Sequence, residues 1–102
     1  MKPKKISKFP LLIAEIANSH GGSADYIEAL CVSLSLIPVP AVKIQLIEAD
    51  DFLTPAHPQY KLFKGLEFED SVYLKCISIL RRKGKTVLFD VFGEKSLSRA
   101  LN

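Results

Sequence analysis

Membrane spans, secretion signals and disulfide patterns are all missing from this sequence. No stretch of its 102 residues approaches the length of a membrane span. Pro10 and Glu15 interrupt any apolar core that a signal peptide would need. The two cysteines, Cys31 and Cys76, both stand within apolar helical patterns. We therefore expect reduced core thiols in a cytoplasmic protein.

The charge pattern gives little support for binding to nucleic acid. The net charge is +3, and Lys2, Lys4 and Lys5 lie in a basic tail over residues 1–8. A short basic run of this kind more often solvates a terminus than binds a partner. Aromatic residues do not alternate with basic ones, as a platform for stacking bases would need. We expect neither nucleic acid nor a membrane as a partner.

Hairpin turn signals are also missing between the predicted strands. Short apolar runs at residues 9–17, 41–47 and 86–92 are typical of strands covered on both faces. Helical patterns separate them, so the predicted order is β-α-β-α-β, with a third helix beginning at the end of the chain. This alternation favours a parallel sheet with right-handed crossovers. A sheet of three strands with two open edges indicates the N-terminal part of a larger α/β protein.

Two helices are predicted from their caps and apolar faces. The first begins after Ser23 and ends before Pro38, and the second begins at Asp70 or Ser71 and ends near Gly84. Their expected buried faces hold Ile27, Leu30, Cys31, Leu34, Tyr73, Cys76, Ile77 and Leu80. The loop before the second helix is unusually long, which suggests a function or a short helix within it.

Polar residues occur late in each predicted strand and on one face of the sheet. Alternation along the strands places Glu15, Lys43, Gln45 and Asp90 on equivalent faces. The carboxyl ends of parallel strands are where α/β folds carry their sites. These four residues are therefore candidates for catalysis and substrate binding. The alternative is a structural ion pair between Glu15 and Lys43, which would add little stability.

The loop after the first strand carries further candidates. His20 would suit a metal ligand or an acid–base group, although a lone loop histidine is more often simply hydrogen-bonded or exposed. Gly21 and Gly22 would let backbone N–H groups approach a phosphate, or would simply form a loop. His57 has no partner at a spacing typical of metal ligands.

The segment "PLLIAEIANSHGGS", followed about 30 residues later by "AVKIQLIEADDF", resembles the start of the sialic acid synthase family. That family includes N-acetylneuraminate synthase and its legionaminate, pseudaminate and spore-coat relatives. The resemblance continues through "LTPAHPQYKLF" to "VLFDVFGEKSL" and so covers nearly the whole chain. It implies a TIM (β/α)8 barrel, of which residues 9–102 would form the first three βα units.

The resemblance also implies a reaction: phosphoenolpyruvate condenses with an N-acetylated amino sugar to give a nine-carbon sugar acid and phosphate. Glu15 matches a glutamate that assists proton movement, Lys43 a lysine that contacts phosphoenolpyruvate, and Gln45 a glutamine near the sugar. Asn18 and His20 match loop residues with a shaping or substrate-side role. The family uses Mn²⁺ or Mg²⁺, whose ligands would lie outside this chain. We expect a homo-oligomer for the full-length protein and no catalysis by this chain alone.

Departures from the family pattern indicate a divergent subgroup. Ala17 stands where the family usually has glycine, and the third strand reads "LFDVFGE" where many members have Ser-Thr-Pro-Phe-Asp. Two other functions stay open from the residues. One is a Schiff-base aldolase with Lys43 as the nucleophile. The other is a non-catalytic fragment or binding module that assembles through its sheet edges.

Overall fold

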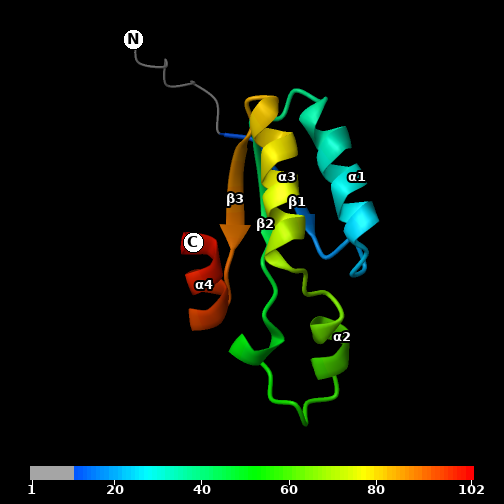
Figure 1. The fold of residues 1–102 in the computed structure, drawn as a ribbon, viewed down its shortest axis with the longest axis vertical. Helices are drawn as coiled ribbons and strands as arrows, with labels where there is room; N and C mark the ends of the chain where they lie inside the picture. The colour runs from blue at the N-terminus through cyan, green and yellow to red at the C-terminus, as the bar shows by residue number, and fades with distance from the viewer. Residues whose placement is uncertain (1–10) are drawn as a thin grey trace.

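Three parallel strands form the sheet in this computed structural model, which describes residues 11–102 (Figure 1). The basic tail over residues 1–8 and the first two residues of the predicted strand 9–17 lie outside the described residues. The strand order is β1-β2-β3, and both neighbouring pairs are parallel, as the alternating sequence pattern predicts. The elements are β1 (Ile13–Ala17), α1 (Ala24–Ser35), β2 (Ala41–Gln45), a 3₁₀ helix η1 (Ala49–Asp51), α2 (Tyr60–Lys64), α3 (Asp70–Arg82), β3 (Thr86–Asp90) and α4 (Glu94–Leu101).

The strands are shorter than their apolar runs. β2 ends at Gln45 although Leu46 and Ile47 are buried, and β3 ends at Asp90. The Leu46 N–H still donates to the Asp90 carbonyl at 2.9 Å, so the segments that follow β2 and β3 stay hydrogen-bonded just beyond the strands. An apolar run indicates which residues are buried and not which are paired in a sheet. Here the buried residues continue past the last paired residue of β2.

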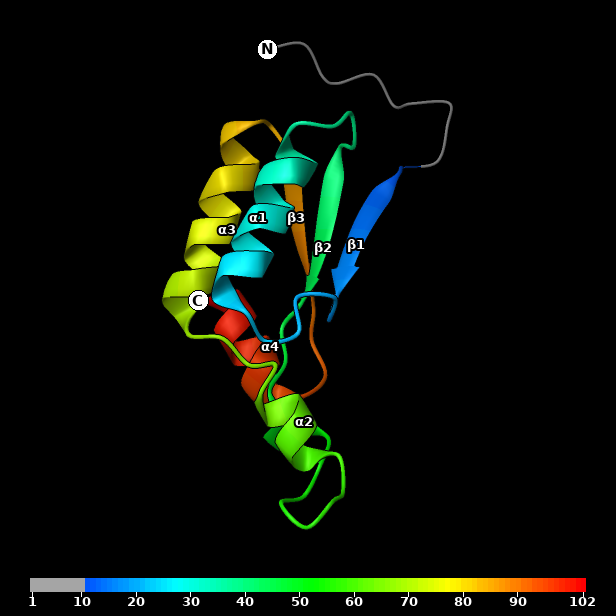
Figure 2. The same ribbon diagram turned by 90° about the vertical axis from the view of Figure 1, so that its right-hand side faces the viewer.

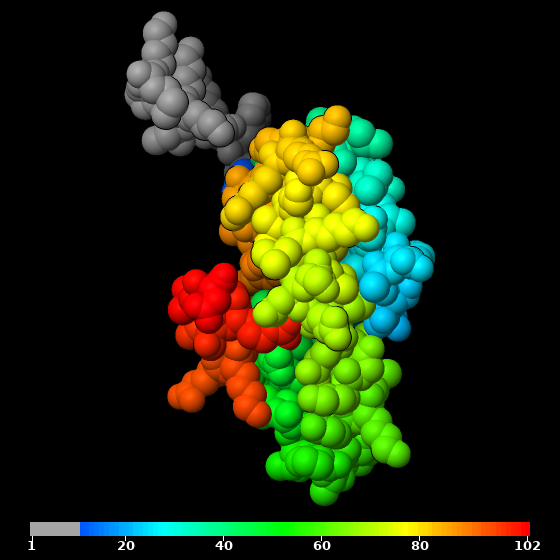
Figure 3. Space-filling model, in the orientation of Figure 1, coloured from blue at the N-terminus to red at the C-terminus, as the bar shows by residue number. Residues whose placement is uncertain are grey.

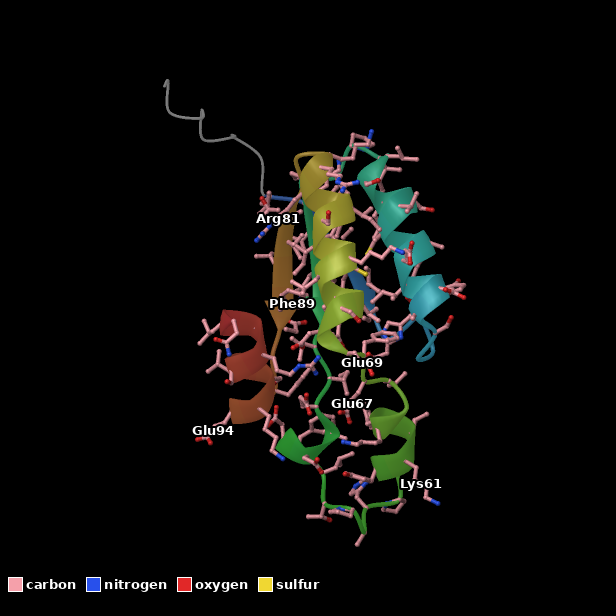
Figure 4. All side chains as sticks on the ribbon, viewed as in Figure 1. Lys61, Glu67, Glu69, Arg81, Phe89 and Glu94 are labelled. Carbon is pink, nitrogen blue, oxygen red and sulfur yellow. The ribbon has the colours of Figure 1, made fainter. Side chains whose placement is uncertain are left out.

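Helices α1 and α3 lie side by side on one face of the sheet (Figure 2). Viewed from that side, their side chains hide most of the strands (Figure 3). The core between the layers contains Val42 and Ile44 from β2. From β3, Phe89 points toward α3 (Figure 4), where its ring meets the Tyr73 ring edge-on at 5.9 Å. Alternation along each strand therefore sends one set of side chains to the helices and the other set to the opposite face.

That opposite face is not covered by any helix within residues 11–102 (Figure 2). Ile13, which points to it from β1, is 40 % exposed. Leu88 of β3 is partly exposed on the same face, next to Lys43 of β2 in the strand register. The continuous apolar runs predict strands buried on both faces, whereas the described residues bury only one.

The predicted start of α1 is confirmed. The Ser23 hydroxyl accepts a hydrogen bond from the Tyr26 N–H at 3.1 Å, which pairs one of the free donors at the start of the helix. The prediction of a side-chain cap at Asp70 or Ser71 for α3 is wrong, because the cap position is Glu69 and it makes no such bond. Asp70 is instead the first helical residue.

The long loop contains two short helical segments, η1 and α2, as its length suggests. Asp50 accepts a hydrogen bond from the Tyr60 hydroxyl at 2.7 Å. Lys64 lies 3.6 Å from the Asp50 carboxylate and 3.2 Å from that of Glu67. These contacts connect the two halves of the loop around a single lysine.

Asp51 fixes the position of α4. Its carboxylate accepts hydrogen bonds from the backbone N–H groups of Lys95 and Ser96, at 3.0 and 2.9 Å. A Cβ atom at Gly93 would lie only 2.7 Å from the Asp51 side chain, so glycine is needed there for a close approach. Asp51 therefore caps a helix that begins more than forty residues later in the chain.

None of the helices within residues 11–102 combines the length and the apolar character needed to cross a bilayer.

Candidate functional site

Lys43 lies between two carboxylates on the uncovered face of the sheet. Its Nζ is 3.5 Å from Oε1 of Glu15 and 3.4 Å from Oδ2 of Asp90. The strand register explains this arrangement, since Glu15 is paired with Lys43, and Asp90 is paired with Gln45, two positions along the same face. The sheet thus brings together the four strand residues singled out from the sequence.

The cluster is partly open to solvent. The side chains of Lys43, Glu15 and Asp90 are 29 %, 47 % and 34 % exposed, so a ligand has access to all three. Burial lowers the pKa of Lys43, but the carboxylates of Asp90 and Glu15 outweigh it and raise the pKa above its usual value. Lys43 is therefore a fixed cation at neutral pH.

The contacts of His20 are with other residues than those of this cluster. His20 is 4 % exposed, and its ring packs on Phe68 with 4.6 Å between ring centroids. Its Nδ1 accepts a hydrogen bond from the Gly22 N–H at 2.9 Å, which closes the loop after β1. Burial lowers the pKa of His20, so the ring is neutral at pH 7. These contacts fit the hydrogen-bonded alternative for a lone loop histidine.

Asn18 begins the same loop, and its Oδ1 is buried without a hydrogen-bond partner among the described residues. The Asn18 backbone carbonyl accepts from the Gly21 N–H at 3.1 Å in a tight turn. Asn18 and His20 thus lie in the loop that follows β1, and neither is hydrogen-bonded to Glu15, Lys43 or Asp90 among the described residues.

The change from strand to loop occurs at Ala17, in a left-handed backbone conformation. Its φ is +51°, a value that an alanine adopts at a cost of roughly 1–2 kcal/mol. The pairing of β1 with β2 also shifts register between Glu15 and Ala17. Ser19 holds this bend, because its hydroxyl donates to the Ile16 carbonyl at 2.7 Å. The strain lies two residues from Glu15 and sets how β1 leaves the site.

Replacement of Ala17 by glycine should relieve this strain. We expect Ala17→Gly to raise the free energy of unfolding by up to about 1 kcal/mol, after the extra chain entropy of glycine is subtracted. Urea unfolding would measure it. Ala14→Gly, in the regular part of the same strand, is the control and should be destabilising. A destabilised Ala17→Gly variant would contradict the strain at this position.

Two carboxylates and one ammonium give the cluster a local charge of about −1. A carboxylate beside a fixed lysine can move a proton or stabilise developing positive charge. An arriving anion would pair with Lys43 by taking the place of one carboxylate. Within residues 11–102 no group of three His, Cys, Asp or Glu residues has the geometry to hold a metal ion.

Comparison with known proteins identifies the fold. No family model matches the chain, and no curated protein sequence matches it. Among solved structures, it is similar to N-acetylneuraminic acid (sialic acid) synthetase from Leptospira borgpetersenii serovar Hardjo-bovis, determined in complex with citrate. The TM-score is 0.77 and the sequence identity 19 %, over 87 % of this chain and 31 % of that one.

The fold class is therefore α/β with parallel strands, as predicted. More specifically, the three strands and their helices match part of the TIM-barrel-like fold of a sialic acid synthetase. This chain spans about a third of the length of that protein. At 19 % identity the likeness shows the fold, and it agrees with the family suggested by the sequence motifs.

The residue that anchors α4 carries no local signal in the sequence. Arg99 donates to Oε1 of Glu48 at 2.6 Å, to the Phe68 carbonyl at 2.7 Å and to Oδ1 of Asp70 at 2.8 Å. Its guanidinium also lies over the Tyr73 ring, 5.4 Å from the centroid. Its partners lie 26 to 51 residues away, so no local pattern could reveal them.

Proposed function

We propose that this chain forms part of the active-site barrel of a sugar acid synthase. The enzyme would condense phosphoenolpyruvate with an N-acetylated amino sugar to give a sialic-acid-like nine-carbon acid and phosphate. The observation that carries the proposal is Lys43 in the middle of β2, held between Glu15 of β1 and Asp90 at the end of β3 on the uncovered face of the sheet. The structural likeness to a sialic acid synthetase supports the choice of reaction.

Lys43 would bind the phosphoenolpyruvate anion. Its raised pKa keeps it charged, and its position on the uncovered face leaves it accessible. Phosphoenolpyruvate carries a carboxylate and a phosphate, and either group could replace a carboxylate of the cluster as the partner of Lys43. Further cations would have to come from other strands, since the local charge here is about −1.

Glu15 would move a proton near the reacting carbons, and Gln45 would hydrogen-bond the sugar. Glu15 is the most exposed member of the cluster, which suits a group that exchanges protons with a substrate. Gln45 and Asp90 are paired across β2 and β3, so both can reach the same ligand. Asn18 and His20 would shape the loop beside it.

A divalent Mn²⁺ or Mg²⁺ ion, which the family resemblance implies, would polarise the aldehyde of the sugar. The residues described here do not supply a set of ligands for it. The role proposed for this chain is therefore limited to holding the anion and moving a proton.

The raised pKa of Lys43 argues against the Schiff-base aldolase. An amine nucleophile needs a lowered pKa, and the carboxylates of Glu15 and Asp90 act in the opposite direction. Borohydride reduction in the presence of a carbonyl substrate separates the two mechanisms. A stable adduct on Lys43 would favour the aldolase.

The proposal is tested by titrating the ¹⁵N-labelled chain with phosphoenolpyruvate and recording its NMR spectrum. We expect shifts of the amides around Glu15, Lys43 and Asp90. Lys43→Met should weaken binding at least about tenfold, through loss of a charge-assisted hydrogen bond. Lys75→Met is the matched control, because Lys75 pairs with Glu28 between α1 and α3, and it should bind normally. Equal binding by both variants would refute the role of Lys43.

A further inference from the structure

Two cysteines meet in the core between α1 and α3. Cys31 lies in the second half of α1 and Cys76 near the middle of α3, and neither is exposed to solvent. Both belong to the hydrophobic cluster that joins these helices to the sheet. The two helices run side by side in both ribbon views (Figures 1 and 2), and sulfur atoms lie between them in Figure 4. Both thiols are free.

The two thiols affect each other's pKa, as neighbours between the two helices do. The thiol of Cys76, together with burial, raises the pKa of Cys31. The thiol of Cys31 lowers the pKa of Cys76. A thiolate in contact with a second thiol is the arrangement from which a disulfide forms.

We propose that Cys31 and Cys76 form an oxidisable pair, which a two-electron thiol oxidant such as an azodicarboxamide or a peroxide converts into a disulfide between α1 and α3. One thiol attacks the oxidant and forms a mixed adduct. The second thiol then attacks the sulfur of the first and displaces the reduced oxidant. Each thiol loses one hydrogen, and the azo group gains both to become a hydrazine.

The disulfide would link the second half of α1 covalently to the middle of α3. Its geometry requires Cα atoms roughly 4.4–6.8 Å apart, a separation that residues in contact across two packed helices can reach. The bond would close a loop that contains β2 and the long segment with η1 and α2. Closure of a loop of this size removes much freedom from the unfolded chain and so stabilises the folded one.

Both sulfurs are buried, so the oxidant must reach them through local opening of α1. The reaction should therefore be slow in buffer and faster in urea concentrations too low to unfold the protein. The disulfide can form only when α1 has packed against α3 again, so oxidation would stabilise the packed arrangement of the two helices.

The experiment treats the 102-residue chain with excess diamide and follows mass and melting temperature. We expect a monomer lighter by two hydrogens, a cross-linked peptide containing Cys31 and Cys76, and a melting temperature higher by roughly 10 °C. Dithiothreitol should reverse all three. Both thiols remaining free in the diamide-treated folded chain would overturn the proposal, and so would disulfide-linked dimers as the main product.

Cys31→Ala and Cys76→Ala are the matched controls. Each removes one thiol and leaves a small apolar side chain in the core, so each variant should fold with modest loss of stability. Neither should gain an intrachain bond or a higher melting temperature with diamide. A diamide-induced rise in melting temperature that persists in either variant would contradict the assignment to this pair.

Discussion

Gly22→Ala should lower the free energy of unfolding by about 3 kcal/mol or more. Gly22 has φ +83°, in the left-handed region, which costs an alanine roughly 1–2 kcal/mol. A Cβ atom there would also overlap the carbonyl oxygen of Gly65, a backbone atom that cannot rotate away. The loop after β1 would have to separate from the segment before α3, and the His20–Phe68 contact would be disturbed with it.

Gly21→Ala is the matched control for this prediction. Gly21 also has a positive φ, +60°, but a Cβ atom there would meet nothing within 4 Å. Gly21→Ala should therefore lower the free energy of unfolding only by the cost of a left-handed backbone for alanine, about 1 kcal/mol. Urea unfolding of both variants measures the difference. Equal stabilities would show that the contact between Gly22 and Gly65 is not tight.

The second large effect is expected at Arg99. Arg99→Ala should cost about 2 kcal/mol, because it leaves the largely buried Glu48 carboxylate and the Phe68 carbonyl without their donor. The pair with Asp70 contributes little to this value, since the Asp70 side chain is 76 % exposed and screened by water. The melting temperature should fall by roughly 10 °C.

Arg99→Lys separates charge from geometry at this position. Lysine keeps the positive charge but cannot direct donors to three acceptors at once, so we expect an intermediate loss. Thermal unfolding at low and high salt distinguishes the contributions. If Arg99→Lys were as stable as the wild type, the hydrogen bonds from the guanidinium to its three acceptors would not be the contacts that stabilise the position of α4.

The strand residues of the site could be predicted because they follow from local rules. Strand alternation and the parallel order together place Glu15, Lys43 and Asp90 on one face, and the observed register does so. Only Asp90 ends its strand, whereas Glu15 and Lys43 are the central residues of theirs, so it is alternation and not position along the strand that groups the three. The short helices of the long loop were foreseeable from its length, although not their positions.

The remaining features depend on contacts between distant segments. The Asp51 carboxylate caps α4 from across the chain, and His20 turns into the core because Phe68 is available to pack on it. A sequence pattern describes neighbours along the chain and cannot show such partners. Ala17 is an intermediate case, because its replacement of the family glycine signals a special backbone but not its φ.

Lys43 is a fixed cation between two carboxylates, and an NMR titration of its side-chain ammonium measures this property. We expect a pKa above the usual lysine value of about 10.4, which falls toward that value in Glu15→Gln and in Asp90→Asn. The ion pairs would then contribute stability below the usual pKa and lose it as the pH rises through the raised one. A pKa below the usual lysine value, unchanged by either substitution, would show that the two carboxylates do not hold Lys43 as a cation.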